Sequence, residues 1–208
     1  MRVSTLRKVH AYGTLLGGMM IHLVLGCVFL FGAITDYLTS YLHKLSPDVS
    51  YDDTFPVLPV SLVLSNLFLP LGRILAQKIG IGYTLAIGVF FCSSAPILAS
   101  FSNTLWQFYL SYAVTFSVGF GLAYVIPIVC AWEHFPDRKG FATGAILVGT
   151  GLGPFFFNLI ADKIVNPEGD SPEKDGYYAK DITGRVKEML RFLGLAWLVI
   201  SGVGMVLL

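Results

Sequence analysis

Charged side chains are scarce in this sequence. Asp, Glu, Lys and Arg make up 13% of the 208 residues, whereas hydrophobic residues make up 55%, and the mean hydropathy is +0.71. Between Ile79 and Trp132 there is no charged residue at all. A water-soluble domain cannot hide such a run, so we expect most of the chain to lie in lipid. The net charge of +1 lacks the basic excess typical of nucleic-acid binding, and we predict no nucleic-acid partner.

Cysteine is scarce as well, and motifs for catalysis or metal binding are missing. Cys27, Cys92 and Cys130 each lie within an apolar run, which favours packing roles over a disulfide framework or a zinc site. The sequence has no H-E-x-x-H spacing, no nucleophile elbow and no phosphate-binding glycine loop after a strand. We therefore predict that the chain is not an enzyme and holds no metal or cofactor.

Long apolar runs, in contrast, are abundant. About 20 apolar residues suffice for a helix to cross a bilayer, and six runs are of that order. We predict an all-α, multi-pass integral membrane protein, in which residues 1–208 form a single six-helix transmembrane domain in the lipid bilayer. The predicted spans are 11–40, 57–78, 83–101, 105–131, 140–164 and 190–208.

The basic residues predict the orientation of these spans. An even number of spans places both termini on one side, together with the short connectors at residues 72–82 and 132–139. Lys and Arg are equally numerous on the two faces, but the positive-inside rule applies best to short loops. Both short connectors are basic, with Arg73 in one and Arg138 in the other, so we predict a cytoplasmic N-terminus.

Glycine is frequent in the fourth and fifth predicted spans, residues 119–157. In lipid, small residues let helix backbones approach closely and so provide packing energy. The sequence Gly149-x-x-x-Gly153 is followed by Pro154, which predicts a bend because proline removes a helix hydrogen bond. A closely packed, bendable pair of spans is typical of a membrane protein that moves rather than of a static anchor.

The first predicted span contains one central polar residue, His22. Gly18 and Gly26 lie one turn before and one turn after it, on the same helix face. His22 is therefore expected to face a neighbouring helix or a water-filled cavity. Two interpretations are open: a residue that handles a ligand or a proton, and a structural hydrogen bond between helices.

Three segments resemble the N-terminal half of a major facilitator superfamily transporter. In the first, between the second and third spans, Gly72, Lys78 and Gly80 are similar to a signature that contains glycine and charged residues. Gln77 stands where an aspartate is usual, and Gly72 comes one residue early. The conformational latch built on that aspartate therefore lacks its usual residue here.

The second segment is the fifth predicted span. Gly140, Gly149, Gly153 and Pro154 match the spacing of an antiporter-type signature, and Phe157 replaces its last glycine. The alternative explanation is the small-residue packing found in any membrane helix bundle.

The third segment, residues 132–144, is similar to the connector of the oxalate/formate antiporter group and its monocarboxylate transporter-like relatives. In those carriers the connector follows a glycine-rich fourth span that ends in a tyrosine, here Tyr124. Asp137 and Arg138 lie within the connector, where they could pair with helix ends on the cytoplasmic side or belong to a solvated turn.

The resemblance implies a six-helix half of a transporter, built as a three-plus-three inverted repeat. It implies alternating-access transport of small organic anions, such as mono- or dicarboxylates, with a second six-helix half as partner. Candidate substrate-binding residues are His22, Phe29, Tyr124 and Thr150. Candidate residues for the conformational change are Gly72, Lys78, Gly80, Asp137, Arg138, Gly140, Gly149, Gly153 and Pro154.

The fourth span also departs from the family. An arginine often tied to proton coupling should fall near Thr115, and no charged residue is present there. The departure favours an antiporter that exchanges anions, or facilitated diffusion. The alternative function is a truncated, non-transporting membrane protein or a partner subunit, which the missing aspartate at Gln77 favours.

Overall fold

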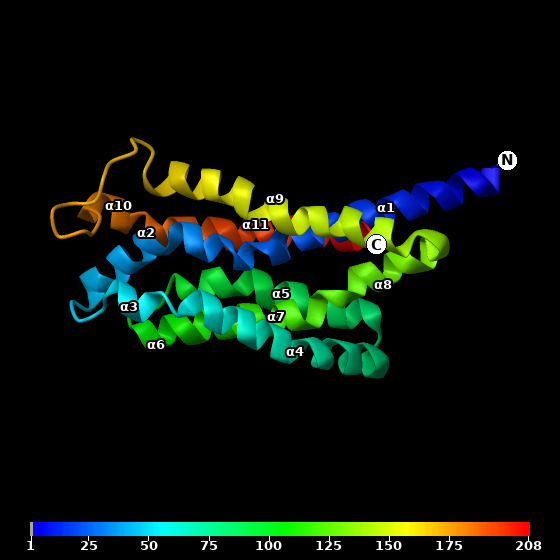
Figure 1. Ribbon diagram of the computed structural model, residues 1–208, viewed down its shortest axis with the longest axis horizontal. Helices are drawn as coiled ribbons and strands as arrows, with labels where there is room; N and C mark the ends of the chain where they lie inside the picture. Colours follow the sequence, from blue (N-terminus) through cyan, green and yellow to red (C-terminus); the bar gives the residue numbers. More distant parts are fainter. Residues whose placement is uncertain (1) are drawn as a thin grey trace.

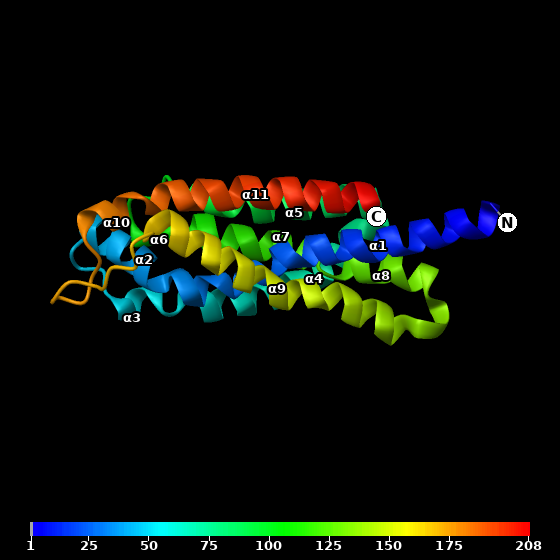
Figure 2. The ribbon, with the colours of Figure 1, turned by 90° about the horizontal axis from the view of Figure 1, so that it is seen from above.

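The computed structural model describes the backbone of residues 2–208 and the side chains of residues 8–208. Within that part of the chain there are no strands, and six apolar helical segments are long enough to cross a membrane. They lie side by side along the long axis of the molecule (Figures 1 and 2). The predicted all-α fold with six transmembrane helices is confirmed. The segments are Lys8–Val28, Tyr51–Ile79, Ile81–Ala99, Leu105–His134, Pro136–Val165 and Lys180–Leu207.

The first three spans are built from α1 to α5. Span 1 consists of α1 and a short 3-10 turn, η1, which interrupts the helix before the chain continues as α2. Span 2 begins with a four-residue helix, α3, and continues as α4, and span 3 is α5. The elements are α1 (Arg2–Leu25), η1 (Gly26–Val28), α2 (Leu30–Leu45), α3 (Tyr51–Thr54), α4 (Val57–Ile79) and α5 (Ile81–Ala99).

The last three spans are built from α6 to α11. Span 4 is also interrupted: it starts as α6, passes through a π-helical stretch, η2, and is divided again between α7 and α8. Span 5 is α9, and span 6 consists of α10 and α11. The elements are α6 (Leu105–Phe108), η2 (Tyr109–Val114), α7 (Thr115–Ala123), α8 (Val125–His134), η3 (Pro136–Arg138), α9 (Lys139–Val165), α10 (Lys180–Gly184) and α11 (Val186–Leu207).

The two ends of the bundle differ in their connections. Both ends of the described chain lie at one end, which we call the terminal end, together with the α4–α5 turn and the η3 connector (Figure 1). The α4–α5 turn is made by Gly80, whose φ of +93° favours glycine. The opposite end, the loop end, carries the longer connections, including residues 166–179.

The helices pack in a pattern that relates the two triplets of spans. Helix α1 packs against α8, α9 and α11, helix α7 packs against α4 and α5, and α5 packs against α11. The principal span pairs are therefore 1–4, 1–5, 2–4, 3–4, 1–6 and 3–6. Exchanging spans 1–3 with spans 4–6 leaves this set of pairs unchanged, as expected for a three-plus-three inverted repeat.

Glycine makes several of these contacts possible. A Cβ atom on Gly26 would collide with the backbone of Thr150, and a Cβ atom on Gly149 or Gly153 would collide with the backbone of α1. In contrast, a Cβ atom on Gly140 would meet no atom within 4 Å. Of the three glycines in the motif of the fifth span, Gly149 and Gly153 thus make close helix contacts, whereas Gly140 does not.

Not every proline within a span interrupts its helix. Pro70 lies inside the uninterrupted α4, and Pro154 inside the uninterrupted α9. Span 4 is instead divided at Tyr124, three residues before Pro127. Because proline has no N–H, Pro127 cannot bond the carbonyl of Ala123, which accounts for the division.

Candidate functional site

His22 joins three spans near the middle of the bundle. Its side chain is fully buried, with 0% of its surface exposed. The Nδ1 atom lies 3.1 Å from Oγ1 of Thr150 in α9, and Nε2 lies 3.1 Å from the backbone carbonyl oxygen of Tyr124, between α7 and α8. Three of the four candidate substrate-binding residues are therefore in contact.

The hydrogen bonds of His22 determine which ring nitrogen carries a proton. A carbonyl oxygen can only accept, so Nε2 is the donor to Tyr124. In the neutral ring Nδ1 is then an acceptor, and the Thr150 hydroxyl donates to it. Both polar atoms of the buried ring are satisfied, so His22 fits the interior without an unpaired group.

The His22 cluster lies where two spans are interrupted. Gly26, at the start of η1, packs on the backbone of Thr150, and Tyr124 separates α7 from α8. The ring of Tyr124 packs on that of His22, with their centroids 4.9 Å apart. Any movement of α1 against α8 or α9 at this level must therefore displace or carry His22.

The candidate residues differ in what a ligand can reach. His22 is enclosed, whereas Tyr124 and Thr150 are half-buried. Phe29 lies between η1 and α2, one residue past the interruption, and 50% of its surface is exposed. In this conformation a ligand could contact the half-buried and exposed members of the set, but not the His22 ring.

The motif residues fall into two groups: Gly149, Gly153 and Pro154 lie in α9 beside the His22 cluster, where the two glycines pack on α1, whereas those of the two short connectors lie at the terminal end. Lys78 and Gly80 are exposed at the α4–α5 turn, and Asp137 and Arg138 are exposed in η3. The η3 connector is held to the bundle by Trp132 and Lys139, the residues that flank it.

Trp132 Nε1 donates to Oγ1 of Thr143 at 2.8 Å, and the ammonium of Lys139 lies 5.6 Å from the centroid of the Trp132 ring. These contacts tie the end of α8 to the start of α9.

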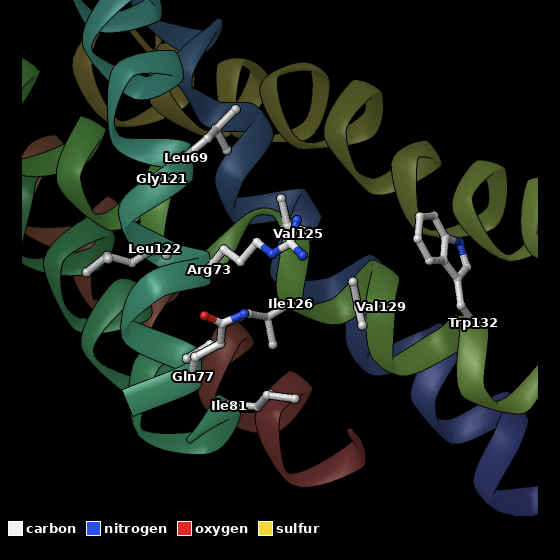
Figure 3. Close-up of a pocket in the computed structure, with 12 residues that line it drawn as sticks. Leu69, Arg73, Gln77, Ile81, Gly121, Leu122, Val125, Ile126, Val129 and Trp132 are labelled. Atoms are coloured by element: carbon white, nitrogen blue, oxygen red, sulfur yellow. The ribbon is translucent and has the colours of Figure 1, made fainter. Parts of the chain in front are cut away.

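The structure also contains a cavity that the sequence did not reveal. It has a volume of about 510 Å³ and lies between α4, the start of α5, and α7 and α8 at the terminal end. Arg73 and Gln77 point into it from α4 (Figure 3). One signal could have identified it: Arg73 is the single charged residue between Val57 and Gln77, and a charge within a span is a functional candidate by default.

Metal-binding groups are not gathered in the part of the chain that the structure describes. No three His, Cys, Asp or Glu side chains among these residues lie close enough to hold a metal ion. The predicted absence of a metal or cofactor stays a prediction.

Comparison with known proteins shows that this chain is similar to transporters. The chain is 25% identical to "Apicoplast pyruvate carrier 1" of Toxoplasma gondii over an alignment that covers 92% of this chain and 44% of that protein. It is 33% identical to "Probable transporter MCH2" of Saccharomyces cerevisiae over 49% of this chain and 22% of the relative. It is 29% identical to "Monocarboxylate transporter 12" of Rattus norvegicus over 49% of this chain and 21% of the relative.

The chain thus spans less than half the length of these curated relatives. No family model matches it. The relatives are transporters and not enzymes, as predicted, and they confirm the resemblance to monocarboxylate transporter-like carriers of the major facilitator type. Together with the six apolar helices, they identify a multi-pass integral membrane protein.

Proposed function

We propose that this integral membrane chain is a six-helix half of a transporter that moves small organic anions by alternating access. The observation that carries the proposal is the packing of its six membrane-length helices, which is unchanged when the two triplets are exchanged. Its likeness to a pyruvate carrier over 92% of the chain supports carboxylates as the class of substrate. We also propose that the terminal end faces the cytoplasm, on the basis of the basic short connectors.

A second six-helix half is the proposed partner. Spans 2 and 5 are the least covered by the rest of the bundle, with 22% and 28% of their apolar windows buried, against 61% for span 1. Each is the middle span of its triplet, so the two are equivalent under the exchange. Asn66, an exposed polar residue on α4, also favours a neighbouring protein surface over lipid on that face.

The proposed substrate site lies beside the His22 cluster. Tyr124, Thr150 and Phe29 would offer hydroxyl groups and aromatic surface, and His22 would act behind them as a positioning residue that holds Thr150 and the Tyr124 backbone in place. The bonds across spans 1, 4 and 5 would have to adjust in each transport cycle. The motif residues at the terminal end, among them Lys78, Asp137 and Arg138, are proposed to take part in that closure.

Transport assays test this proposal directly. The purified chain, alone and co-reconstituted with a six-helix partner half, is placed in liposomes and supplied with labelled pyruvate, lactate, formate or oxalate. We expect saturable uptake of at least one carboxylate above that of protein-free liposomes. Uptake no greater than in protein-free liposomes under both conditions, with correctly folded protein, would refute the proposal.

A further inference from the structure

The cavity at Arg73 results from the way two helices cross. Gly72 packs directly on the Gly121 carbonyl and on Leu122, so α4 and α7 touch at this level. Beyond this point, towards the terminal end, α4 and α8 diverge (Figure 1), and α8 packs against α1 instead. The division of span 4 before Pro127 separates the direction of α8 from that of α7. The wedge between the diverging helices is the cavity.

The lining of the cavity is apolar except on one face. Among the twelve described residues that line it, ten are apolar or glycine, and Arg73 is the only one that carries a charge. Figure 3 shows Arg73 and Gln77 on one face of α4, both directed towards Val125 and Ile126 of α8. The two polar residues are four positions apart, which places them on the same side of the helix.

This arrangement has the chemistry of a site for an amphipathic anion. A guanidinium with no carboxylate among the described lining residues attracts an anion, and its planar donors match the two oxygens of a carboxylate. The Gln77 amide adds two further donors beside it. The remaining walls offer only apolar contact, which suits the hydrocarbon part of such a molecule.

The size of the cavity supports an apolar body as well as a charged head. Its volume of about 510 Å³ lies within the roughly 300–1,000 Å³ common for ligand sites. A two- or three-carbon acid would leave most of these walls uncovered. A single cation also favours a single negative charge on the ligand.

We propose that the cavity between α4, α5 and α8 binds an amphipathic monoanion, such as a medium-chain carboxylate, with Arg73 holding the charged head. The site is distinct from the His22 cluster. Tyr124 packs on His22 on the α1 side of span 4, whereas its neighbour Val125 lines the cavity on the α4 side. The proposal does not depend on transport, because it concerns binding to the chain itself.

Fluorescence quenching tests the site, because Trp132 lines the cavity. The chain is prepared with W106F, which removes an indole that is 78% exposed at the loop end, and is placed in neutral phosphatidylcholine nanodiscs. A medium-chain fatty acid brominated at its tail end quenches tryptophan on contact. We expect saturable quenching with this carboxylate, and only weak, non-saturating quenching with the alcohol of the same tail.

Variants identify the charge responsible. R73Q is expected to weaken the apparent affinity about tenfold or more, and R73K to retain part of it. K78Q is the matched control, because it removes the same charge from the same end of α4 without altering a lining residue. V125F keeps the cation but fills the cavity, and should also abolish saturable quenching. Equal saturable quenching by the acid and the alcohol, or unchanged affinity in R73Q, would overturn the proposal.

A further arm identifies the source of the anion. The titration is repeated in nanodiscs that contain an anionic phospholipid. Loss of quenching there would show that an anionic lipid head competes at Arg73, whereas unchanged quenching would favour a soluble carboxylate; both outcomes keep the monoanion site. If the complete twelve-helix assembly shows no site while the chain alone does, the cavity is occupied by the second half, and the proposal fails for the assembled carrier.

Discussion

His22 and Thr150 lie 128 positions apart in the chain and are joined by a hydrogen bond of 3.1 Å between Nδ1 and Oγ1. The bond connects the first span of one triplet to the middle span of the other. The second ring nitrogen bonds the Tyr124 carbonyl at the division of span 4. A single buried side chain thus couples three helices at the level where two of them are interrupted.

Removal of the His22 ring should lower stability. H22A deletes two hydrogen bonds and leaves the Thr150 hydroxyl and the Tyr124 carbonyl without their partner. Because interhelical hydrogen bonds in membranes contribute about 1 kcal/mol each, we expect the free energy of unfolding to fall by about 1–2 kcal/mol, measured by denaturation in detergent micelles. H22Q should lose less, since an amide can replace one bond.

A double-mutant cycle separates the hydrogen bond from the cavity that H22A creates. We expect H22A and T150V to couple by about 0.5–1.5 kcal/mol. Additive effects would mean that the bond contributes nothing to stability. If transport stays unchanged while stability falls, His22 has only a packing role and no part in the transport cycle.

Gly153 should tolerate no side chain, whereas Gly151 on the same helix should. A Cβ atom on Gly153 would collide with the backbone of Leu23, but one on Gly151 would meet nothing within 4 Å. We expect G153A to cost about 1–3 kcal/mol, in the range of overpacked cores, and G151A to be close to neutral. Thermal unfolding of both variants measures this, and equal effects would show that α1 and α9 are not in close contact.

Tyr177 should hold the long loop at the loop end. Its ring stacks on His43, with centroids 3.8 Å apart, and on Tyr51, with centroids 5.5 Å apart. Aromatic pairs of this kind are worth about 0.5–1.5 kcal/mol, so Y177A should speed hydrogen exchange in residues 166–179. Y83A, at a tyrosine that is 74% exposed, is the control and should leave that exchange unchanged; faster exchange in both variants would argue against a specific stack.

Transport, if reconstituted, should proceed by exchange or facilitated diffusion. No charged residue lies near Thr115, whose hydroxyl bonds the carbonyl of Leu110 within its own span. We expect unlabelled carboxylate inside the liposomes to accelerate uptake or leave it unchanged, and an inward proton gradient to have no effect at equal membrane potential. Uptake driven uphill by that gradient would show that a proton is coupled through another residue.

Much of the architecture could be predicted from composition and spacing. Apolar runs of membrane length are a local property, and the need to satisfy every backbone group in lipid turns each of them into a helix. The alignment of His22 with Gly18 and Gly26 follows from helix geometry alone, and the structure places all three against neighbouring helices or side chains. The close approach at Gly149 and Gly153 was likewise indicated by small-residue spacing.

Other features depended on which helices meet. The spacing singles out Gly149 and Gly153 but not the helix that they meet: that Gly153 packs on α1 while Gly151 faces open space depends on where α1 lies. From the sequence, Arg73 is interpreted as a basic residue of a short connector. In the structure, the divergence of α4 and α8 places it in a cavity. The sequence by itself determined six membrane helices and a resemblance to a family of carriers, since hydrophobic length and motif spacing are local. The tertiary structure decided the partners of His22 and the surroundings of Arg73, because these arise from crossings between segments distant in the chain.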